Sequence, residues 1–312
     1  MKEMVINGVR IRPGQSLNME IAIARLPTHT LIDLPVFIRS SSKPGPTVLI
    51  SGGVHGDEIN GIVSVKRMLE EDMFPPIKGT LIYIPLVNVY GFLSTSRTFP
   101  DGRDLNRSFP GNRKGSLASQ IANILTHEII PQIDYGIDFH TGGRMLSNYP
   151  QIRVDFKDKK GLQLAEKFGT NFTVNSPLID KSFRKEAYKS NKHLLVFEGG
   201  ESMRLDENVI SEGIKGTGRL LKFLKMIEGD YQEGKTMKIK ESSWVRARVS
   251  GIFNSSVSLG EEVKRGQVLA KISDPYGQVK VPVKSNVQGY IIGINNSPVV
   301  NAGDALVHIG KA

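Results

Sequence analysis

Hydrophobic positions in residues 1–229 alternate between strand-like and helix-like spacing. The apolar run at 47–53 is continuous and ends at glycine, which is typical of a strand buried on both faces. Apolar residues within 59–69 then recur at the spacing of one helix face. Because the same alternation continues along the region, we predict an α/β domain. The predicted strands are 19–27, 34–40, 47–53, 79–88, 135–140 and 192–200, and the predicted helices are 58–73, 116–132, 160–169 and 206–229.

Three glycines lie inside the last predicted helix, at Gly213, Gly216 and Gly218. Each costs about 1 kcal/mol relative to alanine in a helix interior. We interpret them as sites where the helix packs closely against a neighbour.

The sequence changes character after residue 229. Residues 230–243 are polar and lack an apolar period, as a linker does, whereas 244–312 alternate short β-branched runs with Gly, Asn and Pro turns. We therefore predict two domains, 1–229 and 244–312, the second entirely β. The second resembles the barrel-sandwich fold of biotinyl and lipoyl carrier domains. Gln278 stands where a carrier would have its lysine, so we interpret this domain as structural or interface-forming.

Composition narrows the classes of function. The 312 residues are 39% hydrophobic and 23% charged, with no apolar segment of the length that a membrane span or signal peptide needs. We therefore expect a cytoplasmic protein. The net charge of +10 is scattered and accompanied by no nucleic-acid motif, so neither nucleic acid nor a membrane is an expected partner. Because the chain has no cysteine, any metal must be bound by histidine and carboxylate groups.

Candidate metal ligands follow two of the predicted strands. His55 and Glu58 lie in "GGVHGDE", directly after the strand 47–53, and His140 ends the strand 135–140. The first pair alone is better explained as a solvated turn, but His140 adds a third candidate ligand, and open α/β sheets build their sites at the carboxyl ends of strands. Two histidines and one carboxylate leave a zinc position for water, as in catalytic sites.

The other four histidines are weaker candidates for metal ligands. We expect them to be structural or surface residues; they are His29, His127, His193 and His308. Asp57, next to the ligand pair, is a candidate for orienting His55.

A candidate general base ends another strand. Glu198 follows the apolar run "LLVF" and precedes two glycines. A carboxylate there could take a proton from water and deliver it to a leaving amine. The alternative is an exposed strand-end acid, and Glu201, which lies off the strand, is the weaker candidate.

Basic side chains in loops are candidate substrate ligands. The loop "SRTFPDGRDLNRSFPG" contains Arg97, Asn106 and Arg107, and guanidinium groups suit the capture of a carboxylate. Arg144 and Arg153 are possible specificity groups. Loop arginines are also commonly solvated.

Four motifs in this order, "GGVHGDE", "DLNRSFPG", "DFHTGG" and "FEGG", resemble the succinylglutamate desuccinylase/aspartoacylase family of zinc-carboxypeptidase-like hydrolases. The resemblance covers nearly the whole chain. It implies a mixed sheet flanked by helices, followed by the small β domain. It also implies one Zn²⁺ per chain, bound by His55, Glu58 and His140.

The resemblance implies roles for the remaining candidates as well. Glu198 would be the general base and acid, Arg97 would polarise the scissile carbonyl, and Asn106 with Arg107 would bind the substrate carboxylate. A family tyrosine from the C-terminal part would correspond to Tyr276 or Tyr290.

The expected activity is hydrolysis of an N-acyl amino acid or a similar small amide that carries a carboxylate. Two alternatives remain: a zinc carboxypeptidase acting on short peptides, and a zinc-binding interaction protein without catalysis. The acyl group, the amine and a possible homo-oligomer stay open.

Overall fold

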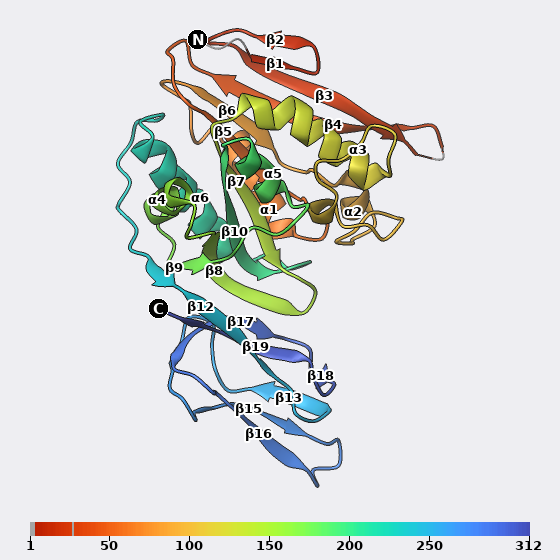
Figure 1. Cartoon of the computed structure of the whole chain (residues 1–312), viewed down its shortest axis with the longest axis vertical. Coiled ribbons are helices and arrows are strands. Elements are labelled where there is room, and N and C mark those ends of the chain that lie inside the picture. Colours follow the sequence, from red (N-terminus) through yellow and green to blue (C-terminus); the bar gives the residue numbers. More distant parts are fainter. Residues whose placement is uncertain (1–3, 27) are drawn as a thin grey trace.

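The computed structural model describes residues 4–26 and 28–312. Within them, thirteen strands form one large mixed sheet, and helices cover both faces of this sheet. Antiparallel strands form a β domain at the C-terminal end of the chain (Figure 1). The predicted fold class is confirmed. None of the helices in this part of the chain combines the length and apolarity that a membrane span requires.

The sheet places its parallel strands at the centre. The order along the main path is β12-β19-β17-β8-β10-β7-β5-β6-β4-β3, in which β10, β7, β5 and β6 run parallel. The side chains of β5, β6 and β7 are almost completely buried, which explains the continuous apolar runs in the sequence.

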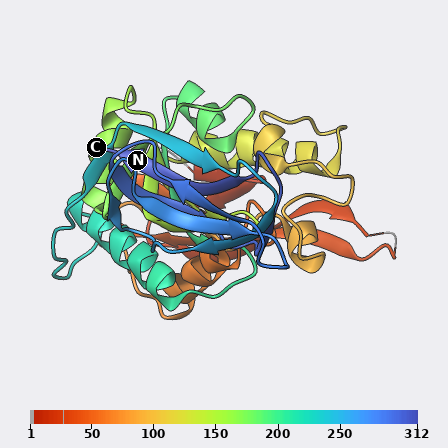
Figure 2. The same ribbon diagram turned by 90° about the horizontal axis from the view of Figure 1, so that it is seen from below.

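The two faces of the sheet have separate cores. Helices α1 and α6 pack with Phe139 and Phe197 on one face, whereas α3 and α5 pack with Leu49 and Ile82 on the other. Figure 2 shows α1 and α6 on the side of the sheet opposite α3 and α5.

The strands are β1 (Met4–Ile6), β2 (Val9–Ile11), β3 (Ser16–Arg25), β4 (Leu31–Ser40), β5 (Thr47–Gly52), β6 (Thr80–Ile84), β7 (Tyr135–Gly142), β8 (Leu146–Val154), β9 (Phe172–Asn175), β10 (His193–Glu201), β11 (Met237–Ile239), β12 (Glu241–Arg246), β13 (Gly251–Ser255), β14 (Glu262–Val263), β15 (Val268–Ser273), β16 (Lys280–Lys284), β17 (Gly289–Asn295), β18 (Val299–Val300) and β19 (Ala305–Lys311). The helical segments are α1 (Ile59–Glu70), α2 (Val89–Leu93), η1 (Leu105–Arg107), α3 (Leu117–Ile124), η2 (Leu125–Ile129), η3 (Ile130–Gln132), α4 (Lys159–Phe168), α5 (Phe183–Lys189) and α6 (Glu207–Phe223).

The C-terminal β domain has its own core. Its four-stranded sheet β16-β15-β13-β18 packs against β12, β17 and β19 of the large sheet. Gln278 lies in the exposed turn between β15 and β16. β17 also pairs with β8, so the large sheet continues from the first part of the chain into the second. The segment 230–243, predicted as a linker, contains β11, which pairs with β9, and the start of β12.

Helix α6 is continuous across its three glycines, as the interpretation of close packing requires. A Cβ at Gly213 would lie 2.7 Å from the Phe139 ring, and one at Gly216 would lie 2.0 Å from the Phe168 ring. A Cβ at Gly218 would lie 2.3 Å from the Tyr231 ring. The glycines let α6 approach the sheet and its flanking aromatic residues.

Gly216→Ala is expected to destabilise the fold. Alanine gains about 1 kcal/mol of helix propensity, but overpacking against the fully buried Phe168 costs typically ~1–3 kcal/mol and more where the ring cannot move. We expect a lower midpoint in urea denaturation. Lys215→Ala, at an exposed position of the same helix, should leave the midpoint nearly unchanged. A midpoint for Gly216→Ala at or above that of Lys215→Ala would contradict this packing argument.

Candidate metal centre and catalytic cavity

His55, Glu58 and His140 meet because two parallel strands end in register. Gly52 of β5 pairs with Phe139 of β7, so the residues that follow emerge at the same edge of the sheet. Glu58 immediately precedes α1. The turn between β5 and α1 is tight: a Cβ at Gly56 would lie 2.0 Å from the backbone of Gly91, so this position requires glycine.

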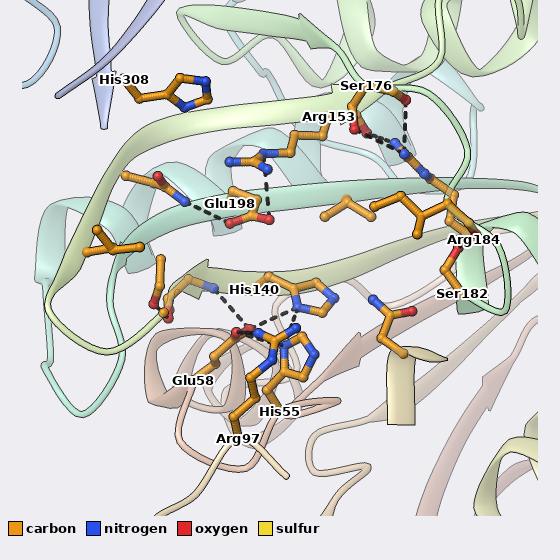
Figure 3. A pocket seen from close by; sticks show the side chains of 18 of the residues that line it. His55, Glu58, Arg97, His140, Arg153, Ser176, Ser182, Arg184, Glu198 and His308 are labelled. Carbon is orange, nitrogen blue, oxygen red and sulfur yellow. Dashed lines mark hydrogen bonds and ion pairs between the residues drawn. The ribbon is translucent and has the colours of Figure 1, made fainter. Parts of the chain in front are cut away.

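The side chains of the three residues converge. His55 Nδ1 lies 2.7 Å from Glu58 Oε1, His140 Nδ1 lies 2.9 Å from Glu58 Oε2, and the two Nδ1 atoms are 3.2 Å apart. Their potential ligand atoms all lie within 4.8 Å of one another, and the three residues are 1–3% exposed (Figure 3). Two imidazoles and a carboxylate in one buried cluster form a donor set that could hold a divalent cation.

Asp138 fixes the orientation of His140. His140 Nε2 donates to Asp138 Oδ2 at 2.7 Å, and Ser51 Oγ donates to Asp138 Oδ1 at 2.8 Å. A neutral His140 with its proton on Nε2 would direct the lone pair of Nδ1 toward the cluster, as a metal ligand must. Sequence reasoning missed Asp138, although its place two residues before His140 on one strand puts both on one face.

Asp104, rather than Asp57, is the carboxylate beside the far nitrogen of His55. His55 Nε2 lies 3.3 Å from Asp104 Oδ1 as an ion-pair contact without hydrogen-bond geometry, and Arg97 Nη2 donates to Asp104 Oδ2 at 2.9 Å. Within residues 4–26 and 28–312 no hydrogen bond joins the Asp57 carboxylate to His55, so the prediction for Asp57 is wrong. Asp104 comes from a distant loop, whereas Asp57 lies on the same turn as His55, with its Oδ1 buried and without a hydrogen-bond partner among the described residues.

The charges of the cluster stabilise one another. Burial alone would raise the pKa of Glu58, but His55 and His140 lower it well below its usual range. Burial lowers the pKa of His140, yet the carboxylates of Asp138 and Glu58 outweigh this and raise the pKa above its ordinary value. Glu58 is therefore ionised, as a metal ligand must be.

Asp138→Asn is expected to weaken metal binding. The change leaves the shape but removes the charged acceptor that orients His140, and losses of this kind lower metal affinity about 10–100-fold. Competition with a chromophoric chelator measures the affinity. Asp72→Asn, at an exposed turn, is the matched control. An affinity equal to that of the control would show that Asp138 does not orient the ligand.

A cavity of about 300 Å³ opens beside this cluster. The structure places all seven residues predicted as metal ligands, catalytic groups or carboxylate ligands on its wall: His55, Glu58, Arg97, Asn106, Arg107, His140 and Glu198. Residues far apart in the sequence thus share one concave site, which is the usual form of a small-molecule site.

Glu198 projects into the cavity from β10, facing the cluster (Figure 3). Asn148 Nδ2 donates to Glu198 Oε2 at 2.8 Å, and Arg153 Nε lies 3.6 Å from Oε1. Glu201 instead accepts from Asn296 Nδ2 at 2.7 Å and is not among the residues that line the cavity. The lower ranking of Glu201 agrees with this geometry, but the expectation that Glu201 lies off the strand is wrong, because β10 extends to it.

The basic loop lies over the metal-ligand cluster. Arg97 Nη1 donates to Glu58 Oε1 at 3.3 Å and lies 3.2 Å from His55 Nδ1. Asn106 Oδ1 accepts from the backbone N–H of Phe183 at 2.9 Å, which leaves the Asn106 amide NH₂ for other partners. The Arg107 side chain is exposed and donates to the backbone carbonyl of Asn106 at 2.6 Å.

The C-terminal β domain also contributes to the wall, but through residues that sequence reasoning missed. Trp244 and His308 line the cavity. Neither candidate tyrosine lines it: Tyr276 is 84% exposed, and the Tyr290 ring packs 5.5 Å from that of Phe172.

Three of the remaining histidines are structural or surface residues, as predicted. His29 and His127 are exposed, and His193 pairs with Asp158 at 2.9 Å. His308 is the exception, because its buried Nδ1 has no hydrogen-bond partner among the described residues. The prediction of a satisfied structural histidine is wrong there, because pairing of distant strands brings His308 to the cavity.

Comparison with known proteins identifies a family and a similar deacetylase. The family model described as succinylglutamate desuccinylase/aspartoacylase catalytic domain matches residues 44–224. The N-alpha-acetyl-L-2,4-diaminobutyric acid deacetylase of Halomonas elongata is 28% identical over 284 residues, covering 86% of this chain and 82% of that protein.

Solved structures share the fold over almost the whole chain. A succinylglutamate desuccinylase/aspartoacylase from Rhodobacter sphaeroides superposes with a TM-score of 0.85 at 25% identity, covering 96% of each chain. The product-bound ectoine utilization protein EutE (DoeB) from Ruegeria pomeroyi has the same fold, with a TM-score of 0.84 at 24% identity and 96% coverage of each chain. The chain belongs to the succinylglutamate desuccinylase/aspartoacylase family.

Proposed function

We propose that this protein is a zinc-dependent deacylase that hydrolyses the amide bond of an N-acyl amino acid or a similar small amide bearing a carboxylate. The observation that carries the proposal is the convergence of His55, His140 and Glu58 at one cavity wall, with the carboxylate of Glu198 facing them. Membership of a deacylase family supports it.

The donor atoms fit zinc. Two imidazole nitrogens and an ionised carboxylate are ligands that zinc accepts, and this chain offers no thiolate as an alternative. Zinc bound by His55, Glu58 and His140 would supply Lewis acidity, which polarises the amide carbonyl and lowers the pKa of water.

Glu198 is assigned the proton transfers. Its carboxylate accepts a proton from the attacking water as the new C–O bond forms, and delivers that proton to the amine as the C–N bond breaks. The products are the free acid of the acyl group and the amine. Asn148, hydrogen-bonded to Oε2, orients the carboxylate toward the cavity.

The loop residues are assigned to the substrate. Arg97, beside the metal-ligand cluster, stabilises negative charge that develops on the carbonyl oxygen. Asn106 and Arg107 bind the substrate carboxylate and thereby orient the scissile amide.

Peptidase activity is less compatible with the cavity. A carboxypeptidase would use the same zinc chemistry, but it needs a groove that accepts an extended chain. Trp244 and His308 from the C-terminal domain line this cavity of about 300 Å³, which favours small substrates.

The test is a screen for amine release from N-acetyl, N-succinyl and N-formyl amino acids, with Nα-acetyl-L-2,4-diaminobutyrate and short peptides included. The zinc-loaded protein should hydrolyse at least one N-acyl amino acid, and a chelator should stop it. Cleavage of peptides alone would favour the carboxypeptidase. A silent panel with zinc confirmed by elemental analysis would favour the non-catalytic alternative.

A further inference from the structure

Two strands of the C-terminal β domain each have one unpaired edge, and a second cavity lies between them. Among the described residues, β12 pairs only with β19, and β16 pairs only with β15 (Figure 1). The cavity has a volume of about 460 Å³ and is lined by residues 244–246 and 248 on the β12 side and by 281–284 on the β16 side. We call it the edge groove. Because consecutive residues of two strands line it, the edge groove runs along the strands, as a site for an extended chain does.

Part of the wall of the edge groove is apolar. Ile272 and Val283 are 1% and 7% exposed and belong to the core of the β domain, and the half-buried Val245 packs against that core. Covering apolar surface of this kind is favourable. A volume of about 300–1,000 Å³ with apolar walls and a few polar groups is typical of binding sites.

The charged side chains that line the edge groove are all basic. They are Arg246, Arg248 and Lys284, and within the described part of the chain no aspartate or glutamate lines it. None of the three forms an ion pair with another described residue, although Arg246 Nη1 donates to the backbone carbonyl of Gly303 at 2.9 Å. The whole chain carries a net charge of +10, so distant charges do not compensate. The edge groove therefore favours an anionic partner.

The same charges disfavour a second copy of this chain as the occupant. Edge-to-edge contact between two copies would bring the basic side chains of both grooves together, and like charges opposite one another destabilise a sheet. Pro282 on β16 lacks a backbone N–H, and proline and lysine on edge strands are typical devices against such association. β12 contains no proline. An acidic strand experiences no such repulsion and can pair with β12.

We propose that the edge groove binds an extended acidic segment of another protein, which pairs through its backbone with the unpaired edge of β12. Side chains of an extended segment alternate between two faces. Carboxylates on one face contact Arg248 and Lys284, while apolar side chains on the other cover Ile272. Backbone hydrogen bonds supply affinity in this mode of recognition, and the side-chain contacts supply specificity. The β domain, in which Gln278 replaces the carrier lysine, then acts as an interaction module.

The test adds a short peptide of alternating glutamate and valine to the full-length protein. Trp244 is the only tryptophan of the chain and lines the edge groove, so its fluorescence reports binding. Anisotropy of a labelled peptide measures the same dissociation constant independently. The glutamate peptide should bind at least about tenfold more tightly than the same peptide with glutamine, because charge-assisted hydrogen bonds are the stronger ones. Added salt should weaken its binding.

A protein variant that carries both Arg248→Ser and Lys284→Ser should bind the glutamate peptide at least about tenfold more weakly than the wild type, since it lacks two of the charges. Both side chains are exposed, so the fold should be retained. Arg265→Ser removes an exposed charge of the same domain outside the edge groove. This control should bind the peptide as the wild type does.

Backbone pairing is tested with two N-methylated peptides, one methylated on the glutamates and the other on the valines. The N–H groups that face β12 belong to one of these two sets, because they alternate along a strand. At least one of the two peptides should therefore lose binding.

Four results would overturn the proposal. The first is no binding of the glutamate peptide, or binding equal to that of the glutamine peptide. The second is unchanged binding in the double variant, and the third is full binding of both N-methylated peptides. The fourth is a wild-type protein that sediments as a dimer while the double variant is a monomer, since a second copy would then occupy the edge groove. None of these measurements depends on deacylase activity, so a failure of that function leaves the test intact.

Discussion

Replacing Glu198 by glutamine is expected to abolish turnover while the metal stays bound. Glutamine has almost the same shape and keeps an oxygen that can accept from Asn148, but it cannot take up a proton from water. Loss of a general base costs about 10²–10⁴-fold in rate. Since Glu198 is outside the group His55, Glu58 and His140, metal content should be unchanged. Steady-state kinetics and elemental analysis on one preparation measure both.

Glu201→Gln is the matched control for this experiment. Glu201 belongs to the same strand β10, but its carboxylate accepts from Asn296 and is not part of the cavity wall. Its kcat should stay near the wild-type value. If Glu198→Gln kept a tenth or more of the wild-type kcat, the assignment of the base would be wrong.

Local sequence signals predicted the centre of the fold well. Strands β5, β7 and β10 are continuous apolar runs that end at polar residues and glycines, and this pattern is visible in a single segment. In a sheet with parallel strands, those ends meet at one edge. The same pattern therefore predicts that His140 and Glu198 lie at the same edge of the sheet, where the cavity is found.

Strand β8 could not be predicted in the same way. It contains Pro150 and shows no regular apolar alternation, so its sequence is typical of a loop. Its partners are β10 and β17, which lie far away in the sequence. As a result Asn148, which orients Glu198, had no local signal. The segment 230–243 was interpreted as a linker for the same reason, because β11 is stabilised by distant β9.

The residues that contact the metal-ligand cluster also differ in whether a local sequence pattern predicts them. Asp138 is predictable from the local sequence, because it is a charged residue inside an apolar strand, two residues before a predicted ligand. A buried charge without a partner is very unfavourable, so a partner such as His140 is expected. Asp104 is not predictable in this way, because its contact with His55 depends on how a loop folds over the sheet. His308 and Trp244 likewise reach the cavity through strand pairing alone.

His140→Ala is expected to remove both the metal and the activity. The variant deletes one of three converging donors and leaves Glu58, a buried carboxylate, without the imidazole at 2.9 Å. It also leaves Asp138 without its partner at 2.7 Å, so two buried carboxylates lose a hydrogen bond. Elemental analysis should find less than a tenth of the wild-type zinc, and hydrolysis should fall to background.

His127→Ala is the control for a missing imidazole, because His127 is exposed and lies outside the catalytic cavity. It should retain both zinc and activity. Circular dichroism and a denaturation midpoint distinguish loss of metal from loss of fold in His140→Ala. A folded His140→Ala protein that binds no zinc yet hydrolyses the substrate at the wild-type rate would contradict metal-dependent catalysis. One that keeps a full equivalent of zinc would exclude His140 as a necessary ligand.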